Sequence, residues 1–148
     1  MSRRVAALTA LVLLSASVAA AQTQRFEITV RNKTEGYGKI DIDKAAIGSA
    51  QIRLWQNTAI EPDCTPHGQT TLTVVHPPEH GAVQISDEPF FYVWPVNSPY
   101  AGCNQTKVAG HRAFYTANAG YTGNDKVVLE GSQPDGMVRR ITVNISVR

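Results

Sequence analysis

Residues 115–125, with the sequence YTANAGYTGND, constrain the fold of this chain more than any other segment. The segment holds two glycines and two tyrosines, ends in Asp125, and lies between runs in which apolar and polar residues alternate. Glycine, asparagine and aspartate favour tight turns, and two-residue alternation is typical of strands with one buried face. The segment therefore predicts a corner between two β-strands.

The same alternation continues along most of the chain. The run at 138–147 is the clearest, because Ile141, Val143, Ile145 and Val147 would share one face and polar residues the other. The best candidate for a helix, residues 43–50, contains Gly48 and lacks an apolar stripe with helical spacing. Further strand-like runs occur at 26–30, 40–42, 52–54, 72–74, 82–85, 90–94, 112–115 and 126–130. We therefore expect an all-β, immunoglobulin-like antiparallel sandwich of about seven or eight strands.

The N-terminus has the pattern of a secretory signal peptide. Arg3 and Arg4 precede an apolar run from Val5 to Val18, and small alanines at 19–21 suit cleavage before Gln22. The run is shorter than the roughly 20 apolar residues that cross a bilayer, so a membrane anchor is disfavoured. We expect residues 1–21 to be removed and residues 22–148 to form one exported domain, periplasmic or secreted, with no membrane insertion of the mature chain.

The charge of the mature chain argues against two classes of partner. Loss of Arg3 and Arg4 leaves 12 of the 14 basic residues, which balance the 12 acidic residues. A neutral chain without a basic stripe is poorly suited to nucleic acid or to anionic lipid, since both depend on excess positive charge. The expected partner is instead a protein or a glycan.

The two cysteines, Cys64 and Cys103, lie in the exported part. An even pair in an oxidising compartment most often forms a disulfide, although metal ligation and a reactive thiol are the competing interpretations. Neither cysteine belongs to a Cys-x-x-Cys motif or lies beside a histidine with zinc-site spacing. We therefore predict a Cys64–Cys103 disulfide.

An aromatic passage precedes Cys103. In residues 90–94, with the sequence FFYVW, alternate members would share a face and fill the sandwich core. The following loop at 95–102 is rich in proline and anchored by Cys103, and Trp and Tyr are enriched where proteins bind partners. The residues that we expect to contact a partner are Trp94, Pro95, Asn97 and Tyr100.

The histidines offer a different hypothesis. His76 and His80 enclose Glu79, but Pro77 and Pro78 exclude the helix that would align two imidazoles for a metal. A loop site that also uses His67 or His111 is the alternative that remains. The sequence shows neither a Gly-x-Ser-x-Gly elbow nor a pair of neighbouring catalytic carboxylates, so we expect no enzymatic activity and no cofactor.

Three segments together resemble the immunoglobulin-like, cadherin-like domains of bacterial secreted and surface proteins. They are residues 77–83 (PPEHGAV), the corner at 115–125, and Asp135-Gly136 before the last strand. The resemblance covers roughly residues 72–147 and departs from the family in Ala117, where the family has proline, and in a longer passage at about 87–107.

The resemblance implies structural roles at the corner. Gly120 and Gly123 would permit unusual backbone angles, Tyr121 would bury its ring with its hydroxyl on a backbone group, and Asp125 would accept backbone N–H bonds. Calcium binding by Asp125 is the functional alternative, but calcium needs six to eight oxygens. The nearest acidic pair, Asp41 and Asp43, fits the exposed face of a strand. The sequence thus predicts a non-enzymatic exported binding or structural module of the bacterial cell envelope, or alternatively a periplasmic metal-binding protein.

Overall fold

The computed structural model of the protein describes residues 36–148. The predicted signal peptide at 1–21 and the strand expected at 26–30 lie outside the described residues. Within residues 36–148, no helix is both long enough and apolar enough to span a membrane.

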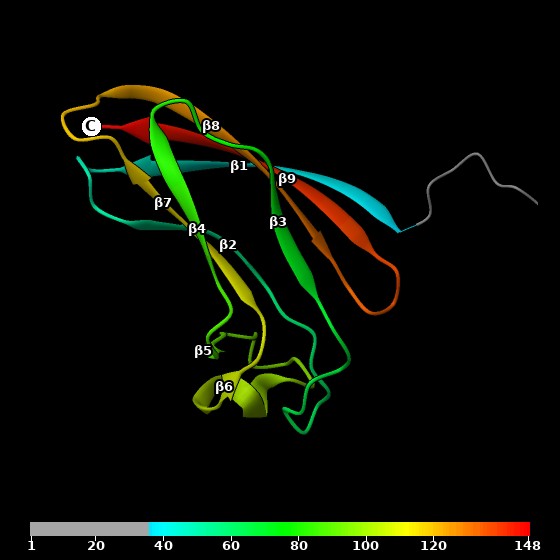
Figure 1. The fold of residues 1–148 in the computed structure, drawn as a ribbon. Helices are drawn as coiled ribbons and strands as arrows, with labels where there is room; N and C mark the ends of the chain where they lie inside the picture. The colour runs from blue at the N-terminus through cyan, green and yellow to red at the C-terminus, as the bar shows by residue number, and fades with distance from the viewer. Residues whose placement is uncertain (1–35) are drawn as a thin grey trace, which may run out of the picture. The chain divides into compact units, whose positions relative to one another are not determined.

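The described part of the chain is all-β, with one short 3-10 helix (Figure 1). Its elements are β1 (Tyr37–Ala46), β2 (Ile52–Asn57), β3 (Thr71–His76), β4 (Gly81–Ser86), β5 (Phe90–Phe91), η1 (Ala101–Gln105), β6 (Lys107–Val108), β7 (His111–Ala117), β8 (Gly123–Ser132) and β9 (Val138–Val147). The strands form sheets of four, three and two strands, in the orders β1-β9-β8-β3, β2-β7-β4 and β5-β6. The all-β prediction is confirmed.

The last strand, β9, lies inside the four-stranded sheet. It pairs antiparallel with β8 and parallel with β1 along its whole length. Ile141, Val143, Ile145 and Val147 are buried and Asn144 is exposed, as the alternation predicts. The pattern from the sequence therefore fixes which face of this strand is inside.

The two larger sheets share one apolar core, which gives the domain a sandwich-like arrangement. The four-stranded sheet contributes residues such as Leu129 and Ile141, and the three-stranded sheet contributes Leu54 and Tyr115. In β7, the small side chains of Ala113 and Ala117 flank Tyr115 on the inner face, and all three are buried. The alanines leave room for one large ring in the centre of the strand.

The aromatic passage departs from its predicted structure. The expected strand at 90–94 is only two residues long, because β5 pairs with β6 at Phe90 and Phe91 and then ends. Phe90, Tyr92 and Trp94 do share a side, but they pack into a second apolar cluster and not into the sandwich core. This cluster surrounds the buried Cys103, which lies in η1, an element that the sequence did not predict.

Candidate functional site

The predicted corner lies between β7 and β8. Gly120 has φ +76° and Gly123 has φ +138°, values that residues with side chains rarely adopt. The Tyr121 hydroxyl donates a hydrogen bond of 2.7 Å to the carbonyl oxygen of Asn124, and the Tyr121 ring is partly buried against the core. The corner therefore has the backbone and tyrosine geometry that the sequence suggests.

Asp125 connects this corner to a second turn, the one between β3 and β4. Its Oδ1 accepts hydrogen bonds from the backbone N–H groups of Glu79 at 3.0 Å and Lys126 at 2.8 Å. Its Oδ2 accepts from the His80 N–H at 3.0 Å and from the Tyr115 hydroxyl at 2.9 Å. One carboxylate, in a residue only 8% exposed, thus ties the β3–β4 turn to strands β7 and β8 through four donors.

The environment of Asp125 favours the charged carboxylate. Burial acts to raise its pKa, but the hydrogen bonds from Lys126, Glu79, Tyr115 and His80 outweigh this effect, so the pKa lies below its ordinary value. Conversely, the pKa of Tyr115 is raised, first by burial and then by its hydrogen bond to Asp125. The tyrosine therefore remains a neutral donor to a charged acceptor.

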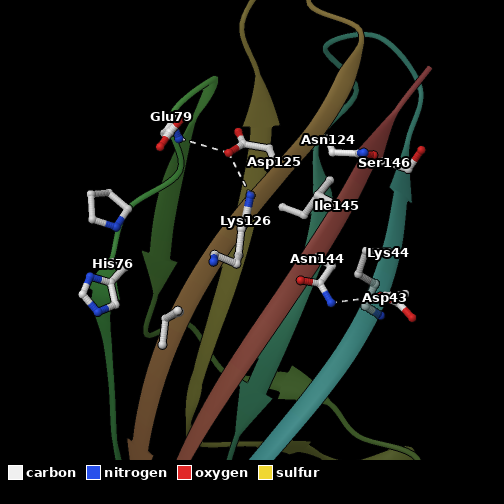
Figure 2. A pocket seen from close by; sticks show the side chains of 12 residues that line it. Asp43, Lys44, His76, Glu79, Asn124, Asp125, Lys126, Asn144, Ile145 and Ser146 are labelled. Carbon is white, nitrogen blue, oxygen red and sulfur yellow. Dashed lines mark hydrogen bonds between the residues drawn. The ribbon is translucent and has the colours of Figure 1, made fainter.

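A broad hollow of about 1000 Å³ lies beside Asp125 (Figure 2). Its wall carries both signs of charge, including Lys44, Lys126 and Glu79, and the Asp43 carboxylate there accepts a hydrogen bond of 3.1 Å from the Asn144 side chain. Asp125 directs its oxygens to backbone donors and a tyrosine hydroxyl, as the dashed lines in Figure 2 partly show. We find no group in this hollow that requires a ligand.

The corner makes a stability prediction. Gly123→Val should destabilise the protein by about 1–4 kcal/mol, because φ is positive and a Cβ there would lie 2.9 Å from the Tyr121 hydroxyl. Tyr121→Ala should cost about 1–4 kcal/mol through the lost ring. Thermal and urea unfolding measure both effects, and Gly102→Ala, which meets nothing within 4 Å, is the control. Unchanged unfolding for both corner variants would contradict the assigned roles.

A second region is built around the disulfide between Cys64 and Cys103, which the structure contains as the sequence predicts. The bond ties the loop after β2 to η1. Asn104 then fixes the aromatic passage, because its Oδ1 accepts from the Trp94 N–H at 2.8 Å and its Nδ2 donates to the Trp94 carbonyl at 3.0 Å. A side-chain amide thus pairs with the backbone as a neighbouring strand would.

Alternation gives this passage two different faces. On the inner face, Tyr92 stacks on Trp94 with ring centroids 4.4 Å apart, and Trp94 lies 6.1 Å from Tyr100. On the outer face, Phe91 is 54% and Val93 79% exposed, and Val96, in the turn after Pro95, is 95% exposed. We call these three residues the apolar ridge.

Of the four residues predicted to contact a partner, two are exposed and two are partly buried. Pro95 and Asn97 are exposed in a tight turn in which the Pro95 carbonyl accepts from the Ser98 N–H at 2.9 Å. Trp94 and Tyr100 are partly buried and pack against the disulfide cluster. The structure therefore brings the four residues into one loop without making them one continuous surface.

A pocket of about 370 Å³ lies beside the inner face, and we call it the aromatic pocket. Trp55, Tyr92, Trp94 and Tyr100 line it, together with polar groups that include Gln56 and Arg139. Most of the remaining lining is polar, and it includes the Asp135 carboxylate.

The four histidines have separate surroundings. The His80 ring stacks on Tyr121 at 4.2 Å, whereas His76 is exposed at the end of β3. His111 contacts the Asp87 carboxylate at 2.6 Å and the Thr70 carbonyl at 2.7 Å, and His67 contacts Glu61. Between Gly36 and Arg148, no group of three or more His, Cys, Asp or Glu side chains is arranged to hold a metal ion.

Three residues of these candidate sites were missed from the sequence. Tyr115 was assigned only to a strand, although its inward place between two alanines was a signal of a central buried ring. Asn104 carried no signal, because its partner Trp94 lies across a loop whose path is set by the disulfide. Arg139 breaks the alternation of β9 at an inward position, and that break was the available signal.

Comparisons with known proteins add little. No family model matches the chain, and no curated protein matches it. Among solved structures, the chain is similar to one described as the structure of PbICP-C in complex with falcipain-2, with 13% identity, a TM-score of 0.34, and coverage of 80% of this chain and 96% of that chain. A similarity of this size supports no statement about the fold or function of this chain.

Proposed function

We propose that the protein is a non-enzymatic exported binding module of the bacterial cell envelope, and that it captures a protein partner through the loop tethered by Cys64–Cys103. We further propose an immunoglobulin-like topology for the sandwich that carries the loop. The periplasm or the exterior suits such a protein, because disulfides persist in oxidising compartments.

One observation carries this proposal. Of the four strongly exposed large hydrophobic residues in the described part of the chain, three form the apolar ridge and only Ile47 lies elsewhere. Isolated exposed apolar residues are ordinary, but a cluster marks an interaction surface. Lys107 adds a cation over the Phe91 ring at 5.8 Å, which leaves a positive charge beside the ridge.

The loop is also held in a defined conformation. The disulfide, the Asn104 amide and the turn at Pro95 restrain the segment between Phe91 and Val96. A restrained loop loses less conformational entropy on binding than a flexible one, so more of the contact energy is retained as affinity. Pro95 and Asn97 are exposed in the adjoining turn, where they would lie at the margin of the contact.

Site-specific photo-crosslinking tests the proposal. A photoreactive residue at Val93 or Val96, introduced in the source cell, should form a discrete adduct with a protein partner, whereas the same residue at Ile47 should not. With the partner isolated in this way, Val93→Ser with Val96→Ser should weaken its binding by about tenfold or more. Ile47→Ser, at an equally exposed apolar position of 78%, is the matched control. Equal crosslinking at the three positions, or unchanged affinity of the ridge variant, would refute the proposal.

Tyr100→Ala refines the assignment. It removes a ring from the inner face. If that ring fixes the conformation of the loop, the variant should bind the partner more weakly. Loss of stability together with binding would assign Tyr100 to the cluster, as its packing on Trp94 suggests.

A further inference from the structure

From the aromatic pocket we infer a second binding site, separate from the apolar ridge, that takes an acidic sugar residue such as a hexuronic acid. The inference depends on a charged group, an unpartnered acceptor and a wall of rings that face the same space.

Arg139 supplies the charge from an unusual position. It lies two residues before the buried Ile141 on β9, and so belongs to the inward-facing series of that strand. Its register partners are Gly38 on β1 and Gly131 on β8, so neither neighbouring strand places a side chain over it. An inward, partly buried guanidinium is costly without an anion, and within residues 36–148 no carboxylate forms an ion pair with Arg139. Asp135 also lines the pocket, but its Oδ1 accepts a hydrogen bond of 2.9 Å from the Met137 N–H.

Gln56 supplies the acceptor. Its Oε1 is buried and has no hydrogen-bond donor in the described part of the chain, although the residue lines the aromatic pocket. A buried acceptor without a donor is unfavourable by roughly 1–3 kcal/mol, and a rotation of the side chain that brings Oε1 into the pocket would let a ligand hydroxyl remove that penalty. Nearby Asn57 is already satisfied by Gln133, Thr71 and Ser132, so the need for a donor is specific to Gln56.

The wall supplies the shape. Tyr92 packs on Trp94 with its plane tilted by 33°, and Trp94 lies beside Tyr100 at a tilt of 40°, so the three rings form one aromatic cluster at the edge of the pocket. A pyranose ring has apolar C–H faces that can lie on such a surface and hydroxyl donors around its edge. A uronic acid adds a carboxylate, which the planar guanidinium of Arg139 can bind through two parallel hydrogen bonds.

This set of groups favours an acidic sugar over an acidic peptide. A peptide carboxylate would satisfy Arg139, but an extended peptide does not offer a ring with both apolar faces and an outer row of hydroxyls. The volume of about 370 Å³ lies at the small end of ligand pockets, which suits one or two sugar rings.

Intrinsic fluorescence gives a direct readout, because both tryptophans of the chain, Trp55 and Trp94, line the pocket. Glucuronic acid should change the fluorescence of the mature protein in a saturable way at concentrations up to tens of millimolar. Glucose, which lacks the carboxylate, should bind at least about tenfold more weakly, since a hydrogen bond to a charged group is worth about that factor. Acetate, which lacks the ring, should give no saturable change.

Two variants test the assigned groups without removing the wall. Arg139→Gln should reduce affinity for glucuronic acid by about tenfold and leave the weak binding of glucose unchanged. Gln56→Leu should weaken both sugars and should not lower the melting temperature, because the orphan acceptor is removed. Tyr100→Leu, which removes an aromatic ring but keeps both tryptophan reporters, should weaken the response to both sugars.

Failure of this inference can be distinguished from failure of the proposal for the apolar ridge, because different variants affect the two sites. Val93→Ser with Val96→Ser should bind glucuronic acid as the wild type does, and Arg139→Gln should still bind the protein partner. Equal affinity for glucose and glucuronic acid, a wild-type response of Arg139→Gln, or the absence of any saturable response to glucuronic acid would overturn the inference. Tighter binding of a short glutamate-rich peptide than of glucuronic acid would also overturn it and assign the pocket to peptides.

Discussion

Asp125→Ala should lower the free energy of unfolding by about 3–5 kcal/mol, one of the two largest effects that we expect in this protein. The substitution removes the acceptor of three backbone N–H groups and leaves the Tyr115 hydroxyl only the His80 carbonyl at 3.4 Å, and a buried unsatisfied donor costs about 1–3 kcal/mol. Partial hydration of the exposed Glu79 should keep the total below the sum. Urea unfolding at neutral pH measures the loss.

The same carboxylate should make stability depend on acid. Because the pKa of Asp125 is lower in the folded protein than in the unfolded chain, its contribution is complete above the unfolded value of about 3.9. The contribution is then lost as the pH falls through the folded pKa. As the pH falls below about 4, the wild type should therefore lose more stability than Asp125→Asn. The free energies of unfolding of the two proteins should converge in acid.

Two variants serve as controls for Asp125. Tyr115→Phe removes one of the four donors and keeps the ring, so the expected loss is only about 1 kcal/mol. Asp41→Ala removes an exposed carboxylate from β1 and should change stability by less than about 0.5 kcal/mol. If Asp125→Ala behaved like Asp41→Ala, the carboxylate would not hold the two turns together.

Loss of the disulfide should have an effect of similar size. Its cysteines are separated by 39 positions, and closing a loop of that length stabilises a fold by about 4 kcal/mol in the chain-entropy model. Cys64→Ser with Cys103→Ser should therefore lower the free energy of unfolding by about that amount. The second apolar cluster should loosen most, since Cys103 is fully buried within it.

Alkylation and denaturation together test this second prediction. Without reductant, the mature protein should show no alkylated thiol by mass, and after unfolding with reductant it should show two. Reductant should lower the stability of the wild type and leave the double serine variant unchanged. Two alkylated thiols before reduction would contradict the bond.

The sequence was sufficient where local pattern and final structure agree. From Ile141 to Val147, strand β9 follows its alternation residue by residue, because one face of that part of the strand meets the core. Gly120 and Gly123 signalled the corner, because a positive φ leaves few other residues suitable. The expected strand at 90–94 was wrong in length because Pro95 and the disulfide redirect the chain after Phe91.

The features missed from the sequence depend on contacts between distant segments. Asp125 was expected to bind backbone groups of its own turn, and it does bind Lys126, but two of its other donors lie 45 and 46 residues away. Similarly, Asn57 bonds to the carbonyl of Ser132 at a separation of 75 residues. No local pattern contains such pairings, because they are set by how the sheets pack.

The parallel pairing of β1 with β9 gives the domain a mechanical property. A force that pulls the start of β1 and the end of β9 in opposite directions acts along the strands and loads their ladder in shear. The ladder joins ten residue pairs, from Tyr37 with Val138 to Ala46 with Val147, and in shear these bonds must yield together. An antiparallel hairpin such as β8–β9, pulled from its two open ends, would instead unzip one pair at a time. Tension between the first and last strands of residues 36–148 therefore loads all ten pairs of this ladder at once.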